Sequence, residues 1–168
     1  LTFASADLTT VKLTGYYLDI TSSGNSNLAT VDIDATMDDL NLTNNDNLTS
    51  LDVTGSQIND VTLTGNDGLE TAVFDHTTEM NYIGATTDDK DVTVTITDNL
   101  ALTSLTFGGD NVSTLTVTGN DKLDTIDFDG LDAISTSSTV DATVNVWDNA
   151  ITVATATDIV DGLTTQYA

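Results

Sequence analysis

Acidic side chains dominate the chemistry that this chain can offer. Among its 168 residues, 27 are Asp or Glu and 3 are Lys or Arg, so the formal net charge is −24. Calcium prefers hard oxygen ligands that are gathered in loops. The clusters that best suit it are Asp88, Asp89 and Asp91, then Asp110 with Asp121, then Asp127, Asp129 and Asp132. None has EF-hand spacing, so they predict either specific calcium sites or diffuse cation binding.

The chain contains few of the side chains that catalysis requires. Acid–base and nucleophilic enzymes bring together groups of different pKa, and this chain has 1 His, no Cys and no Arg. His76, with Glu79 nearby, could serve in catalysis or metal binding, but an exposed loop position is the simpler interpretation. Acid pairs such as Asp32 and Asp34 recur throughout, so none stands out as a glycosidase pair. The sequence predicts a protein that is not an enzyme.

The negative net charge also limits the kinds of partner that the chain can bind. So acidic a surface repels phosphate backbones and anionic lipid, which argues against binding nucleic acid. Direct membrane insertion is not expected either, because no apolar run approaches the roughly 18 residues of a spanning helix. The partners that remain are cations, further copies of the chain, other surface proteins and glycans.

A long internal repeat is the strongest pattern in the sequence. The segment LTSLDVTGSQINDVTLTGNDGLETAVFDH at 48–76 aligns without a gap on LTSLTFGGDNVSTLTVTGNDKLDTIDFDG at 102–130, with 14 identities in 29 positions. Within it lies a shorter unit, apolar-x-x-apolar-x-apolar, whose starts fall ten or eleven residues apart, as at Ile58/Val61/Leu63. Two apolar positions spaced by two predict one short strand per unit, with one face inward.

Asparagine marks every second unit, three residues after the last apolar position, although Asn25 after Ile20 fits this rule more loosely. The set is Asn25, Asn45, Asn66, Asn99, Asn120 and Asn149. Its spacings of 20, 21, 33, 21 and 29 indicate a coil of about 21 residues with insertions near 75–89 and 131–140. Turn formation alone would explain single asparagines. Because this set recurs with the coil, we favour an internal ladder in which the amides bond to free backbone groups.

These patterns predict an all-β fold, a right-handed parallel β-solenoid. We expect about six coils with two short strands each, because one coil cannot bury its apolar strip alone. The solenoid should occupy residues 1–156, and residues 157–168 should form a C-terminal cap or tail, either a short helix with Thr157 as its N-cap or a strand separated from its neighbour.

Threonines at spacing two should point outward from several strands: Thr62/Thr64, Thr93/Thr95/Thr97 and Thr116/Thr118. β-Solenoid ice-binding proteins present such rows. Here Asp19, Asn41, Asn145 and Trp147 interrupt the rows, which favours plain strand propensity over an ice-binding surface. Trp147 itself should be an exposed aromatic residue and thus a candidate for a subunit contact.

The unit from Ile58 to Asn66 has the form LxxLxLxxN, as do those from Met37 to Asn45 and from Val112 to Asn120. It resembles the short repeats of bacterial surface leucine-rich-repeat proteins of the internalin type and, more loosely, receptor L-domains. The resemblance implies a cell-surface location and a role in adhesion or assembly, and brings no catalytic residues. This chain departs from it in having a strand-like second half-repeat.

The resulting functional hypothesis is an extracellular structural module that assembles into a surface layer, sheath or filament with the help of cations. An adhesin or receptor-like module that binds glycan or protein is the alternative. An ice-binding protein and a carbohydrate-active β-helix enzyme are less favoured, the latter because the aromatic residues are few and scattered.

Overall fold

In the computed structural model the described residues are 1–5, 7–17, 19–54, 58, 60–75, 93–108, 111–112, 114–130, 133–134 and 143–152. Every regular element among them is a β-strand. Most of the two expected insertions and the whole of the expected cap, 157–168, lie outside the described residues.

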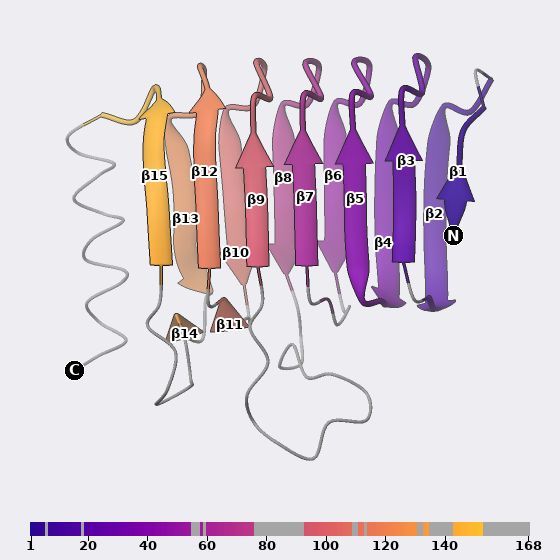
Figure 1. The fold of residues 1–168 in the computed structure, drawn as a ribbon, viewed down its shortest axis with the longest axis horizontal. Helices are drawn as coiled ribbons and strands as arrows, with labels where there is room; N and C mark the ends of the chain where they lie inside the picture. The colour runs from indigo at the N-terminus through magenta and orange to yellow at the C-terminus, as the bar shows by residue number, and fades with distance from the viewer. Residues whose placement is uncertain are drawn as a thin grey trace.

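The strands form two parallel sheets that face one another (Figure 1). The seven-stranded sheet comprises β1 (Thr2–Phe3), β3 (Asp19–Ser23), β5 (Asp39–Thr43), β7 (Asp60–Thr64), β9 (Thr93–Thr97), β12 (Thr114–Asn120) and β15 (Thr143–Asn149), in that order. The six-stranded sheet comprises β2 (Thr10–Tyr16), β4 (Thr30–Thr36), β6 (Ser50–Thr54), β8 (Thr71–Asp75), β10 (Ser104–Gly108) and β13 (Thr125–Gly130). Two short strands, β11 (Asn111–Val112) and β14 (Ala133–Ile134), pair separately.

The order of the strands confirms the predicted parallel β-solenoid. The chain passes from one sheet to the other and back, so each strand pairs with the strand one coil later. The pairing keeps equivalent residues side by side: Val61 lies beside Leu40 on one side and Val94 on the other. Because each coil adds at the same register, side chains of one kind form columns that run along the molecule.

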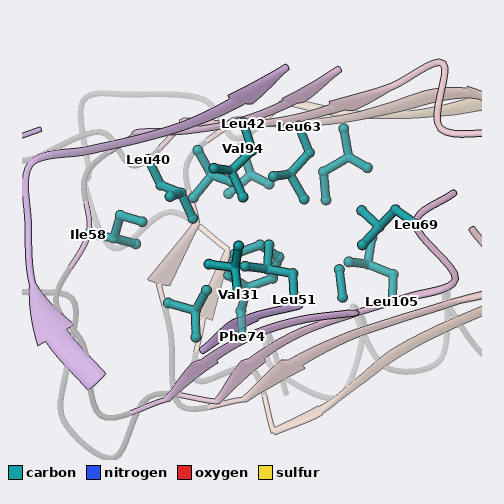
Figure 2. Close-up of a cluster of buried hydrophobic side chains, with 14 of the residues drawn as sticks. Val31, Leu40, Leu42, Leu51, Ile58, Leu63, Leu69, Phe74, Val94 and Leu105 are labelled. Carbon is teal, nitrogen blue, oxygen red and sulfur yellow. The ribbon is translucent and has the colours of Figure 1, made fainter. Parts of the chain in front are cut away.

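The inward columns make one continuous core between the sheets (Figure 2). Leu40, Leu42 and Leu63 face Val31, Leu51 and Phe74 across it. Full burial of such a side chain contributes roughly 1.5–3 kcal/mol. Alternation with period two places these residues inward and the intervening Thr and Asp outward, which is why short Thr- and Asp-rich segments form strands here.

The turn that leaves the seven-stranded sheet has the form Asn-x-x-Leu. The carbonyl of Asn45 accepts a hydrogen bond from the Leu48 N–H at 2.9 Å, and Asn66 and Leu69 repeat this at 2.9 Å. The leucine is buried in each case. The turn therefore delivers an apolar side chain to the end of the core and leaves its asparagine pointing into the solenoid.

The residue before each ladder asparagine is left-handed, with φ between 53° and 68°. These residues are Gly24, Asn44, Gly65, Asp98, Gly119 and Asp148. Glycine, Asn and Asp are the residues that tolerate this conformation best. At Gly65 the neighbour matters as well, because an added Cβ would lie 2.7 Å from Oδ1 of Asn44 on the adjacent coil. The short polar side chain of one coil thus occupies the space over the glycine of the next.

Candidate functional site

The asparagine ladder is the main polar structure inside the solenoid, and Asn66 shows its geometry. Oδ1 of Asn66 accepts from the backbone N–H of Asn45 at 3.0 Å and from Nδ2 of Asn45 at 3.1 Å. Nδ2 of Asn66 donates to the Leu42 carbonyl at 2.9 Å and to Oδ1 of Asn99 at 3.2 Å. One side chain therefore connects the coils before and after it.

The same pattern runs the length of the described solenoid, which confirms the predicted ladder. The backbone N–H of each asparagine from Asn25 to Asn120 donates to Oδ1 of the next one at 3.0–3.1 Å. The members are Asn25, Asn45, Asn66, Asn99, Asn120 and Asn149, all buried except Asn149, which is half-buried. Because the position needs both a donor and an acceptor, the amide of asparagine suits it.

Two serines that the sequence analysis did not identify belong to the ladder. The backbone N–H of Ser5 donates to Oδ1 of Asn25 at 2.7 Å, and its carbonyl accepts from Leu8 at 3.1 Å, so Ser5 holds the ladder position of the first turn. Its spacing to Leu8 was the available signal. Ser22 is buried in the column of Leu42, and its Oγ donates to Oδ1 of Asn45 at 3.0 Å. Ser22 explains why the apolar pattern before Asn25 is loose.

Outside the core, three carboxylates form a column on the seven-stranded sheet. Asp19, Asp39 and Asp60 lie side by side on β3, β5 and β7. Burial raises the pKa of Asp39 above its ordinary value, and the charges of Asp60, Asp19 and Asp38 raise it further. Like charges that lie opposite one another on paired strands destabilise a sheet.

Replacing Asp39 with Asn should therefore stabilise the protein at neutral pH. The folded state binds a proton at Asp39 more tightly than the unfolded state does, so the destabilisation is fully present above the folded pKa. It is relieved as pH falls from that pKa towards the ordinary value of 3.8. With solvent screening included, we expect the free energy of unfolding to rise by about 0.2–0.5 kcal/mol at pH 7. Below the ordinary pKa of Asp39 the substitution should bring no gain. Chemical denaturation at several pH values measures both.

Asp46→Asn is the matched control, since it removes the same charge from an exposed turn. An equal gain from Asp46→Asn would assign the effect to net charge rather than to the column.

The six-stranded sheet carries a column of mixed charge. Lys12, Asp32 and Asp52 lie side by side on β2, β4 and β6. Nζ of Lys12 is 2.6 Å from Oδ2 of Asp32, and this hydrogen bond and the charge of Asp32 raise the pKa of Lys12. Burial, then the charges of Asp32 and Asp75, raise the pKa of Asp52. The remainder of the column is Val73, Thr106 and Asp127.

The described residues include three of the eight candidate calcium ligands. Asp121 is exposed in a turn, Asp127 is exposed on β13, and Asp129 lies in the same strand. The others, Asp88, Asp89, Asp91, Asp110 and Asp132, lie outside the described residues, as do His76 and Glu79. Within the described ranges, no group of three or more His, Cys, Asp or Glu side chains could hold a metal ion. Specific calcium binding stays a prediction.

Trp147 is exposed, as the alternation predicted, with 64% of its surface accessible. It lies on β15 beside Thr118 of β12. A large aromatic side chain at the end of a threonine-rich column is a candidate contact residue.

The fold and the ladder together define the chain as a parallel β-solenoid whose coils are linked by stacked asparagines. Compared with known proteins, it matches no family model, no curated protein and no solved structure. The resemblance to surface leucine-rich repeats therefore rests on the residues alone. The described part of the chain contains no helix long and apolar enough to cross a membrane.

Proposed function

We propose that the protein is a non-enzymatic structural module of a cell surface, and that its solenoids associate into a layer, sheath or filament. Cations, calcium among them, would reduce repulsion between acidic faces. The acidic composition supports an extracellular setting, and the interlocked coils support a rigid rod. Such a rod would keep its shape within an assembly, because each coil is bonded to the next through both sheets and through the ladder.

The observation that carries this proposal is the charge at the two ends of one outward column. Lys12 lies on β2, the strand at one edge of the six-stranded sheet, and Asp127 lies on β13, the strand at the other edge. A second solenoid that adds β2 beside β13 in the same parallel register would bring its Lys12 next to Asp127. Lys12 already accepts an acidic neighbour at this spacing, since it pairs with Asp32 on the adjacent strand.

Electron microscopy of the purified protein tests the proposal. Ordered filaments or sheets should form in millimolar calcium and dissolve on chelation, whereas sodium chloride of equal ionic strength should be less effective. Lys12→Glu should weaken the assembly, and Lys122→Glu, the same charge change in an exposed turn, should leave it intact. Monodisperse particles of wild-type protein under every condition would exclude self-assembly.

A binding module for glycan or protein is the second candidate, and the exposed Trp147 favours it. Since the chain has 1 Trp, its fluorescence reports on this position alone. A protein that stays monodisperse and whose emission shifts on addition of a glycan would support the adhesin.

A further inference from the structure

A block of threonines occupies two successive outward positions on each of three neighbouring strands in the seven-stranded sheet. We call it the threonine face and define it by Thr62, Thr64, Thr95, Thr97, Thr116 and Thr118. Thr95 lies between Thr62 and Thr116, and Thr97 lies between Thr64 and Thr118. The strands β7, β9 and β12 run side by side in Figure 1. The face is therefore periodic in two directions, along the strands and across them.

The interruptions seen in the sequence lie outside this block. Asn41 lies on β5 and Asn145 and Trp147 lie on β15, so they flank the three strands. Asp19 belongs to a different column, the one that continues through Asp39 and Asp60. The interruptions that favoured plain strand propensity therefore spare the two columns of the threonine face, although Asp60 of β7 interrupts the next column, beside Thr93 of β9.

The threonine face is uncharged on a chain of net charge −24. The comparable outward column of the six-stranded sheet carries Lys12, Asp32, Asp52 and Asp127. Charged groups hold hydration shells of their own, whereas threonine offers one hydroxyl and one methyl group. The threonine face and this charged column thus differ in how they order water, and the charged residue that borders the face on its own sheet is Asp60 of β7.

The hydroxyl groups in the row formed by Thr62, Thr95 and Thr116 are available to water. Within the described residues, the side chains of Thr62, Thr95 and Thr116 make no hydrogen bond to protein. In the neighbouring row, Oγ1 of Thr64 and Oγ1 of Thr97 are 3.1 Å apart and bond to each other. In one row Thr64 and Thr97 hold each other in place, and the other row presents donors and acceptors at regular intervals.

The spacing of these groups is close to that of a tetrahedral water lattice. Water oxygens hydrogen-bonded about 2.75 Å apart in tetrahedral geometry have second neighbours about 4.5 Å apart. Parallel strands lie about 4.8 Å apart. Alternate residues along a strand are about 6.6 Å apart, within about a tenth of the perpendicular repeat of about 7.3 Å that the same water geometry produces.

We propose that the threonine face binds ice. A two-dimensional repeat suits a ligand that is itself periodic, whereas a single protein partner does not require one. Crystalline polysaccharide is also periodic, but it is bound through aromatic side chains that stack on sugar rings, and among the described residues the aromatic side chain at the edge of the face is Trp147 alone. This activity is separate from the proposed structural role and does not depend on it.

Ice-growth assays with two matched variants test the proposal. Wild-type protein should show thermal hysteresis and inhibit ice recrystallisation. Thr95→Lys places a charge at the centre of the face and should abolish both activities. Thr106→Lys makes the same change at a half-buried outward position on the opposite sheet and should retain them. Circular dichroism melting curves establish that both variants are folded.

Three results would overturn the proposal. Wild-type protein could affect ice growth no more than buffer does. Alternatively, both variants could be folded and yet lose activity equally. Binding to crystalline cellulose or chitin, sensitive to Thr95→Lys and without any effect on ice, would assign the face to polysaccharide instead.

Discussion

Replacing Asn66 with Ala is expected to lower the free energy of unfolding by about 3–5 kcal/mol. The side chain is fully buried and joins two coils. Without it, the Asn45 backbone N–H loses its acceptor and the Leu42 carbonyl loses its donor. Each buried polar group left unsatisfied costs about 1–3 kcal/mol, and the missing side-chain volume adds to this. Urea denaturation followed by circular dichroism measures the loss.

Asn41→Ala controls for the ladder prediction, because Asn41 is an exposed asparagine on the outer side of β5. It should change stability by less than about 0.5 kcal/mol. Asn149→Ala should fall between the two, since Asn149 is half-buried and is the last ladder member in the described residues. Equal losses at the buried and exposed positions would show that the ladder bonds contribute nothing specific.

Phe107→Ala is expected to destabilise the protein by about 3–5 kcal/mol, the usual cost of removing a buried phenylalanine. Phe107 is 1% exposed and lies in the middle of a stack, with ring centroids 5.6 Å from both Phe74 and Phe128. The substitution leaves a cavity between three coils and removes two ring contacts. Thermal and urea unfolding both report the effect.

Val73→Ala on the adjacent strand is the control for the aromatic stack. Val73 points outward from β8 and is only half-buried, so its loss should cost about 1 kcal/mol or less. A loss comparable with that of Phe107→Ala would contradict the assignment of the core to the inward columns.

Two periodicities in the sequence were enough to predict the fold class. Apolar residues spaced by two, as at Val61/Leu63 and Leu115/Val117, identify inward strand positions, and both pairs are buried on β7 and β12. The recurrence of asparagine with the coil predicted the ladder. Both periodicities can be recognised in a single sequence, because side chains alternate along every strand and equivalent positions recur in every stacked coil.

Ser5 and Ser22 show what these periodicities miss. Serine is common in turns and on strand surfaces, so neither position stands out by residue type. Ser22 replaces an apolar residue, and only the tertiary structure, in which its Oγ bonds to both Asn25 and Asn45, shows that the substitution continues the ladder inward.

The threonine face depended on tertiary structure for a different reason. The sequence determined which threonines point outward within a strand, because alternation is local. It did not determine that Thr62 lies beside Thr95, which is 33 residues away across an insertion. Neighbours in a solenoid are set by backbone pairing between coils and by the shared core, so the charge-free block and the opposite charges at the ends of one column became visible only once the coils were stacked.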